Sequence, residues 1–359
     1  AEAEVTDSLI VSGAARYDDY DGFGDTVNLK LAANWSITDE FAIRGAMSTG
    51  FRAPSMQQLY FNNISTQFVT DPDNPEGDQI AVQIGTFRND SQLAQAIGIP
   101  ELKEEESTNF SLGTVIQATD NINITVDFYT IDIDDRIVIS NKLGEGLSPA
   151  LDAALKASGA GAGQFFLNGA DTETKGVDII ATWNTELFSG DLDLTFAANF
   201  TDTEVVNLFT PPDSGLGDIP PEVIFSEQDI SIIEEWQPQD RVSLTGLYRI
   251  GDFTVNLAFN RYGEYTITDG GRQTYGAEVL TDLRVNYDIN DNFSLNIGAN
   301  NLFDVYPDKN EIGNSRTGTI VDSSGNTIVS SPGVFTYSRR SAPFGFNGAY
   351  YYAGAEYRF

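Results

Sequence analysis

The sequence contains neither cysteine nor histidine, and its 20 lysine and arginine residues stand against 53 aspartate and glutamate residues in a chain of 359. Without cysteine, the chain has no disulfide framework, no thiolate metal site and no cysteine nucleophile. Without histidine, Ser-His-Asp triads, histidine-bound zinc and the commonest general base at neutral pH are also excluded. We therefore expect the protein not to be an enzyme, although carboxylate-based chemistry remains open.

Two further absences concern partners and membrane helices. The formal net charge of -33 repels nucleic-acid phosphates and no basic block offsets it, so nucleic acid is excluded as a partner. No stretch approaches about 18 consecutive apolar residues, so no transmembrane helix is predicted. The first residues, AEAEVTDS, lack the basic and apolar regions of a signal peptide. The chain is therefore expected to be either a mature form or one without its original N-terminus.

Apolar residues recur at every second position along most of the chain, which is the period of a β-strand. Between Thr26 and Ile37, for example, Val27, Leu29 and Leu31 fall on one face while mostly polar residues fill the other. The alternation changes phase over residues 128–134, which predicts a β-bulge, and only residues 149–158 are expected to form a helix, inside a loop. About twelve strands are predicted, near residues 8–20, 25–37, 41–52, 104–117, 121–139, 170–185, 190–206, 238–250, 253–265, 275–288, 291–303 and 344–359.

Short and long connections alternate between these strands. Long polar links are predicted at residues 53–103, 140–169, 207–237 and 304–343. Tight turns separate them near residues 36–40, 118–121, 186–190, 251–252 and 288–292. An up-and-down sheet with tight turns on one side and large loops on the other produces this order, as outer-membrane barrels do.

Alternation alone does not tell whether lipid or a protein core covers the apolar face, because a soluble sandwich alternates too. Three features favour lipid. The predicted strands mostly reach the roughly nine to eleven residues that a tilted membrane strand needs. Charged residues keep to the polar face, and aromatic residues gather near strand ends, as in interfacial girdles. We therefore predict an all-β fold: an antiparallel up-and-down transmembrane β-barrel in a Gram-negative outer membrane, surrounded by lipid and lipopolysaccharide.

Several segments resemble TonB-dependent receptors. RGAMSTGFRAPSMQQLYF (residues 44–61) is similar to a strand and loop start that carry the family's GFRAPS pattern. LKEEESTNFSLG (102–113), VDFYTIDIDDRIVIS (126–140) and NGADTETKGVDIIATW (168–183) resemble the strands that follow, and LNIGANNLFDVYPD (295–308) resembles the G-x-x-N-L-F-D signature. The segment from residue 337 to the final Phe359 looks like the terminal strand of Bacteroidota-type members. Each match is weak alone, but together they keep the family's order along nearly the whole chain.

The resemblance implies a 22-stranded outer-membrane barrel with an N-terminal plug domain in its lumen. It also implies energy-coupled import of a scarce nutrient, such as a siderophore-iron complex, cobalamin or an oligosaccharide. Since about twelve strands and no plug are present, residues 1–359 are expected to be the C-terminal portion of such a barrel. The implied partners are the N-terminal barrel strands, the plug, the TonB complex acting through the plug region, and a surface lipoprotein.

Open sheet edges are not tolerated in lipid, so a portion of a larger barrel needs further strands at both edges. Alternatively, twelve is an even number and these strands close by themselves. That arrangement would make a passive outer-membrane channel, which is the alternative function. A soluble adhesion sandwich and a carboxylate enzyme are the remaining alternatives.

One group of candidate substrate-binding residues follows the GFRAPS pattern. Arg52 lies within it, and Tyr60 and Phe61 begin the loop that comes after it. The resemblance implies a loop near the substrate here. The simpler interpretation is that Arg52 pairs with an acidic loop residue and that Tyr60 and Phe61 pack inside their own loop.

A second group of candidates consists of aromatic residues at outer strand ends or in loops. Such rings stack on sugars or chelates, although anchoring at the membrane interface is the simpler interpretation. These candidates are Trp236, Tyr262 and Tyr265.

An acidic stretch, DPDNPEGD, offers the hard oxygen ligands that Ca²⁺ prefers, while its prolines break the usual calcium-loop spacing. A solvated acidic loop is therefore the simpler interpretation, and no other cofactor is expected. The weak metal candidates are Asp71, Asp73 and Asp78.

Overall fold

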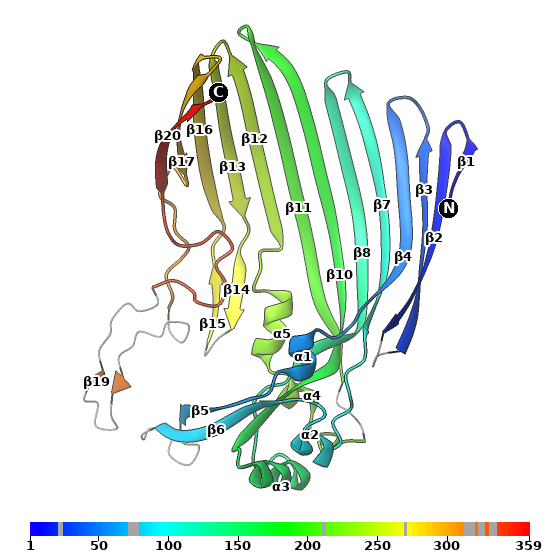
Figure 1. Ribbon diagram of the computed structural model, residues 1–359, viewed down its shortest axis with the longest axis vertical. Helices are drawn as coiled ribbons and strands as arrows, with labels where there is room; N and C mark the ends of the chain where they lie inside the picture. Colours follow the sequence, from blue (N-terminus) through cyan, green and yellow to red (C-terminus); the bar gives the residue numbers. More distant parts are fainter. Residues whose placement is uncertain are drawn as a thin grey trace.

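A computed structural model describes residues 1–20, 24–70, 79–209, 213–268, 271–311, 320–321, 327–329 and 336–359. Its main feature is one large antiparallel sheet that curves like part of a barrel wall (Figure 1). Neighbouring strands follow the order of the sequence, so the predicted all-β, up-and-down architecture is confirmed. Along the sheet lie β1 (Glu2–Thr6), β2 (Leu9–Tyr20), β3 (Gly24–Ser36), β4 (Phe41–Arg52), β7 (Glu105–Thr119), β8 (Ile122–Ile139), β10 (Ala162–Leu187), β11 (Gly190–Leu208), β12 (Asp240–Ile250), β13 (Phe253–Tyr262), β16 (Glu278–Asn290), β17 (Phe293–Asn300) and β20 (Tyr350–Tyr357).

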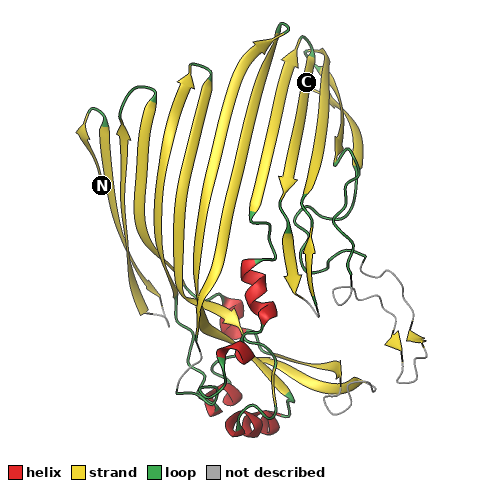
Figure 2. Cartoon of the chain, turned by 180° about the vertical axis from the view of Figure 1, so that it is seen from behind, coloured by secondary structure: helices red, strands yellow, loops and turns green. Residues whose placement is uncertain are grey.

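The five predicted tight turns lie at one end of the sheet, and the long connections with the described helices lie at the other (Figure 2). We call the latter the outer end. The turn between β10 and β11 has φ of 48° at Phe188 and 66° at Ser189, the left-handed pair that a two-residue hairpin requires. The outer end carries α1 (Met56–Tyr60), β5 (Asn63–Thr70), β6 (Gln79–Phe87), α2 (Gln92–Ala96), β9 (Leu143–Gly144), α3 (Pro149–Ser158), α4 (Pro221–Ile224), α5 (Glu227–Glu234), β14 (Tyr265–Thr268), β15 (Arg272–Tyr275), β18 (Ile320–Val321) and β19 (Thr327–Val329).

The predicted strands match the structure except at a few ends. β1 escaped prediction because its alternation of acidic with small or apolar residues, EAEVT, covers only five positions. β10 begins at Ala162 rather than near 170, since its first part leaves the main sheet and pairs with β6 and β9. The strand expected to reach residue 265 ends at Tyr262, and Tyr265 and Tyr275 belong instead to the separate β14–β15 hairpin.

The expected bulge in β8 lies just beyond the predicted segment. Ile133 pairs with Thr172 of β10 and Arg136 pairs with Ala170, so β8 uses three steps where β10 uses two. Asp135 adopts a left-handed φ of 55° at this point. The extra residue reverses which side chains of β8 face each side of the sheet.

The apolar parity of the strands faces outward, as predicted for a surface in contact with lipid. Leu31, Leu112 and Phe128 are 62 %, 47 % and 55 % exposed. Both clusters of buried apolar side chains found among the described residues lie at the outer end, and neither lies against the sheet's apolar face. A soluble sandwich, which needs that face buried, is therefore excluded.

The two edges of the sheet are formed by β1 and β20, which do not pair with each other among the described strands. These strands therefore do not close into a barrel by themselves, contrary to the alternative of a self-closed channel. None of the helices in the described ranges is both long and apolar enough to cross a membrane.

Candidate functional site

Beyond the outer strand ends, three long connections pack into one apolar cluster, which we call the outer-loop core. The chain between β4 and β7, that between β8 and β10, and that between β11 and β12 all contribute, together with the first part of β10. In α3, the Ser148 hydroxyl accepts a hydrogen bond from the Leu151 amide, and Gly159 (φ 72°) ends the helix. The buried members are Phe87, Leu93, Ala94, Ile97, Ile99, Leu143, Leu151, Ala154, Leu155, Ala160, Phe165, Leu167, Leu216, Ile219, Ile224 and Phe225.

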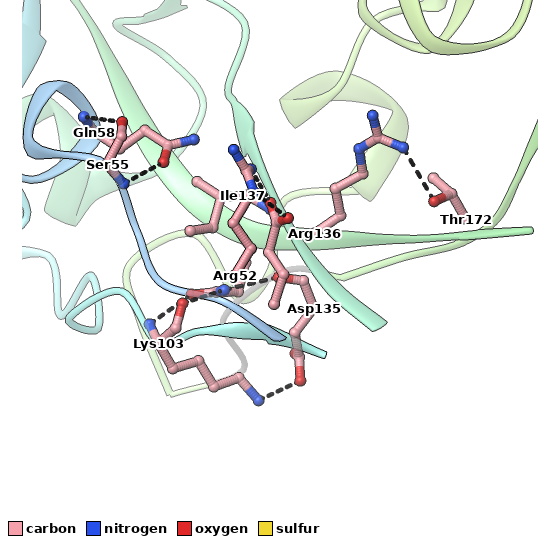
Figure 3. Close-up of polar contacts among 10 residues, drawn as sticks. Arg52, Ser55, Gln58, Lys103, Asp135, Arg136, Ile137 and Thr172 are labelled. Atoms are coloured by element: carbon pink, nitrogen blue, oxygen red, sulfur yellow. Dashed lines mark hydrogen bonds and ion pairs between the residues drawn. The ribbon is translucent and has the colours of Figure 1, made fainter. Parts of the chain in front are cut away.

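Where the outer-loop core meets the sheet, three charged residues line one small pocket: Arg52, Glu105 and Arg136, which we call the mouth cluster. Figure 3 shows Arg52, and Arg136 reaching toward Thr172. Arg52, the last residue of β4, is the register partner of Glu105, the first residue of β7. Its Nε donates to Glu105 Oε2 at 2.7 Å and its Nη2 donates to Oε1. The Ile137 amide also donates to Glu105 Oε1, at 2.7 Å. Glu105 is thereby held by three donors although it is only 5 % exposed.

All three members of the mouth cluster lie on the polar face of the sheet. Arg52 shares the parity of Arg44, which forms a two-bond ion pair with Asp127 across the face. Arg136 reaches the same face because the bulge in β8 reverses the parity just before it. Its Nη1 donates to the Thr172 hydroxyl at 3.2 Å.

The mouth cluster carries a net positive charge, because it holds two guanidinium groups and one carboxylate, and Arg52 pairs directly with Glu105. Burial lowers the pKa of Arg136; the charge of Glu105 opposes that shift and the charge of Arg52 adds to it. An arginine starts from so high a pKa that it stays protonated. Among the described residues Arg136 has no ion-pair partner within 4 Å, and its one hydrogen bond is to Thr172. Its remaining N–H groups suit a carboxylate or another planar oxyanion.

Besides the mouth cluster, a cation–aromatic group lies on the polar face, at the outer ends of β12 and β13. Arg241 and Tyr262 are register partners, and the guanidinium carbon lies 4.8 Å from the tyrosine ring centroid. Arg241 Nη2 also donates to the Tyr262 hydroxyl at 3.2 Å. Phe344 lies against the same ring, with centroids 5.3 Å apart. Tyr262 is thus one of the predicted aromatic residues that lie against a cation, here at the outer ends of two paired strands.

The other predicted aromatic residues occupy two different environments. Tyr60, in α1, and Phe61, which follows it, are 58 % and 48 % exposed, and Arg88 lies over the Tyr60 ring at 5.1 Å. Trp236 and Tyr265 are instead nearly enclosed, at 8 % and 3 % exposed. The open pair is therefore accessible at the outer end, whereas the enclosed pair packs inside the loops.

The enclosed pair belongs to one small aromatic cluster with Ile267 and Tyr275. Trp236 Nε1 donates to the Ser231 hydroxyl at 2.9 Å. Tyr265 stacks on Tyr275 at 4.9 Å, and burial raises the pKa of the Tyr265 hydroxyl. The cluster therefore joins the connection between β11 and β12 to the β14–β15 hairpin.

The acidic candidates Asp71, Asp73 and Asp78 lie outside the described residues. Within the ranges that the structure describes, no group of three or more carboxylates is arranged to hold a metal ion. The calcium site therefore stays a prediction.

Sequence reasoning missed Glu105, Arg136 and Arg241 as members of the mouth. A signal for Glu105 was available, because an up-and-down order places the end of one strand beside the start of the next. Arg136 was harder to find, since its face depends on the exact position of the bulge. Arg241 required the pairing of β12 with β13 in the observed register.

Replacing Arg52 with methionine is expected to lower the free energy of unfolding by about 1–3 kcal/mol, because the enclosed Glu105 carboxylate loses two charged hydrogen bonds. The double variant Arg52→Met with Glu105→Gln should be less destabilised, since it leaves no unpaired charge. The control Arg358→Met, which breaks an exposed pair with Glu356, should cause no measurable loss. Denaturant unfolding of the full receptor measures the free energy of unfolding of the single, double and control variants. A double variant that is less stable than Arg52→Met would contradict the pairing of Arg52 with Glu105.

Comparison with known proteins agrees with this geometry. The family model described as "TonB dependent receptor-like, beta-barrel" matches residues 1–302. The chain belongs to this family. TonB-dependent receptors are outer-membrane transporters rather than enzymes, which agrees with the expectation from the missing histidine and cysteine. A search of curated proteins finds no significant match.

Solved TonB-dependent receptors share the fold of this chain at low sequence identity. The siderophore receptor PirA from Acinetobacter baumannii has a TM-score of 0.59 and 18 % identity, with 100 % of this chain and 44 % of PirA covered. A variant of the ferric enterobactin receptor PfeA from Pseudomonas aeruginosa gives 0.60 and 16 %, covering 99 % and 43 %. The pyoverdine-bound receptor FpvA from the same species gives 0.55 and 13 %, covering 100 % and 41 %. The chain thus spans less than half the length of these receptors.

Proposed function

We propose that this chain is the C-terminal barrel portion of an energy-coupled outer-membrane receptor that imports an anionic iron chelate of the siderophore type. The observation that carries the proposal is the cationic mouth cluster on the polar face. The similar solved receptors include two named for siderophores or ferric enterobactin and one bound to pyoverdine. The whole chain has a net charge of -33 and repels anions elsewhere on its surface. A local excess of arginine at the mouth would therefore direct an anionic ligand to that place.

The geometry supports capture of an oxyanion. Glu105 is occupied by Arg52 and by the Ile137 amide, so it has little capacity left to bind a cation. Arg136 keeps donors available and is held in place by Thr172. An anion beside Arg136 would therefore gain charge-assisted hydrogen bonds without breaking the Arg52–Glu105 pair.

The partners of such a receptor follow from the two unpaired edges. β1 and β20 require further strands in lipid, and the N-terminal strands of the same receptor would supply them. A plug domain would lie against the polar face, and the TonB complex would act through the plug region. A surface lipoprotein remains a further candidate partner.

Uptake of a radiolabelled ferric siderophore tests the proposal, using the receptor that contains this chain in a strain without other ferric-siderophore receptors. Arg136→Gln should weaken ligand binding about tenfold, the loss of one charge-assisted hydrogen bond. The matched control is Arg249→Gln. Arg249 lies in the same sheet, near the end with the tight turns, and pairs with Asp193. The control should bind as tightly as the parent.

Two outcomes would contradict the proposal. Equal ligand binding by Arg136→Gln and the parent would show that the mouth cluster does not bind the ligand. Uptake that needs neither TonB nor the proton-motive force would point instead to passive diffusion through the barrel.

A further inference from the structure

A small sheet lies at the outer end, beyond the strands of the main sheet (Figure 1). β6 pairs with β5 on one side and with the first part of β10 on the other. β9 pairs with the same part of β10. The strands therefore run in the order β5–β6–β10–β9, and β5 and β9 form the two edges. An edge strand presents unpaired N–H and C=O groups to which a further strand can add.

The two edges of the small sheet differ in how well they are protected. β9 is only two residues long, so it offers little backbone to a further strand. β5 is eight residues long, with the sequence NISTQFVT. It contains no proline and no charged residue, which are the usual means of keeping a further strand away from an edge. Its isoleucine, threonine, phenylalanine and valine favour the extended conformation. β5 is therefore an unprotected edge.

The free side of β5 is uncovered within the part of the chain that the structure describes. β5 pairs with β6 alone among the described strands, and no other described backbone hydrogen bond involves residues 63–70. Gln83 Nε2 donates to the Thr66 hydroxyl, and Lys142 Nζ donates to Gln67 Oε1, each at 2.7 Å. Gln83 belongs to β6 and Lys142 precedes β9, so both contacts come from within the small sheet.

Exposed apolar side chains lead into this edge. Met56, at the start of α1, is 69 % exposed, and α1 buries none of its residues. Tyr60 and Phe61 follow it, and Ile64, the second residue of β5, is 46 % exposed. A strand beside β5 would bring its side chains to about 5 Å from those of β5 and would cover Ile64. Backbone groups and apolar surface thus call for the same kind of partner, an uncharged extended segment.

We propose that the free side of β5 pairs with a strand from an outer loop of the N-terminal part of the same receptor. The pairing rests on the proposed function, because it takes this chain to be the C-terminal part of a receptor. The chain covers 44 % of PirA, so more than half of a receptor of that length lies outside it. Further strands beside β1 and β20 would continue the up-and-down order, which brings their long connections to the same end as β5.

A loop of the same molecule is favoured over a separate protein. Its pairing with β5 is intramolecular, so it avoids the loss of translational and rotational freedom that a second polypeptide incurs. β5 also carries no charge that would select an oppositely charged partner or raise its rate of encounter.

Photo-cross-linking in the full receptor, expressed in its outer membrane, tests the proposal. A benzophenone side chain in place of Ile64 should cross-link to a segment that precedes this chain in the receptor, without any gain in mass of the polypeptide. The control carries the same group in place of Phe188, which is 83 % exposed at a tight turn, and should form no cross-link to an outer loop. A cross-link from position 64 to a second copy or to another protein would overturn the proposal, and so would the absence of any cross-link.

Two proline variants test the strand pairing itself. The N–H groups of adjacent residues in a strand point to opposite sides, so one of Ser65 and Thr66 donates toward β6 and the other toward the free side. With a strand on each side, Ser65→Pro and Thr66→Pro both lose a ladder bond, and each should speed hydrogen exchange of the other β5 amides about tenfold in the full receptor. If one of the two variants exchanged as slowly as the parent, the free side would be open to solvent and the proposal would be wrong.

Neither measurement needs a ligand, so the result is separable from the proposed function. A receptor with TonB-dependent uptake but no cross-link from position 64 would refute the pairing alone. A receptor that forms the intramolecular cross-link but takes up no ferric siderophore would support the pairing and contradict the proposed substrate.

Discussion

Alanine in place of Phe165 is expected to destabilise the outer-loop core by about 3–5 kcal/mol, the cost of removing an enclosed aromatic ring. Phe165 is 0 % exposed and stacks on Phe87 with ring centroids 6.1 Å apart. The two residues are also register partners in the parallel pairing of β10 with β6. The cavity would therefore separate the chain between β4 and β7 from the first part of β10.

Limited proteolysis of the receptor in outer-membrane vesicles measures this effect. The outer loops of Phe165→Ala should be cut faster, while the sheet stays intact because β10 keeps its long ladders with β8 and β11. The matched control is Phe188→Ala, which removes a ring that is 83 % exposed at a tight turn. Its loops should resist protease as the parent does. Equal resistance in Phe165→Ala would mean that the three connections do not depend on a shared core.

Arginine in place of Leu112 is expected to destabilise the receptor by about 2–4 kcal/mol, the cost of a guanidinium at the middle of the bilayer. Leu112 lies midway along β7 on the apolar face, with Gly45 and Phe128 as its register partners. It is 47 % exposed, so the cost comes from lipid contact rather than from steric overlap in a packed core. The measurement is the temperature at which the receptor changes from its folded to its unfolded mobility in a gel, and this temperature should be lower for Leu112→Arg.

The neighbouring residue provides the control. Ser111 has the opposite parity and faces the polar side, where Tyr129 is its register partner. Ser111→Arg should therefore cost much less than Leu112→Arg. If the two variants were equally stable, the apolar face would not be the one in contact with lipid.

Much of the sheet could be predicted because alternation is a property of consecutive residues. Val27, Leu29 and Leu31 reveal the lipid-facing parity of β3 without any knowledge of the neighbouring strands. Tight turns could be predicted for the same reason, because each depends on a few consecutive residues, as the Phe188–Ser189 turn illustrates. β1 gave only a weak signal, because Glu2 and Glu4 alternate with small or apolar residues over just five positions.

The candidate site was predicted less completely. Arg52 was identified, and it pairs with an acidic residue as the simpler interpretation held, but the partner Glu105 lies 53 positions away across a long connection. Trp236 and Tyr265 were candidates for stacking on a ligand, with interface anchoring as the simpler interpretation, whereas the structure encloses both. Their burial depends on contact with Tyr275 and Ile267, which alternation does not describe.

The sequence by itself determined the β period, the outward apolar parity, the order of turns and loops, and the family. These features arise from neighbouring residues and from motifs read in chain order. Only the tertiary structure decided that three loops share a core around Phe165, that the bulge at Asp135 turns Arg136 to the polar face, and that β1 and β20 remain apart. Contacts between distant residues depend on how connections fold over one another, and a single strand's pattern carries no record of that packing.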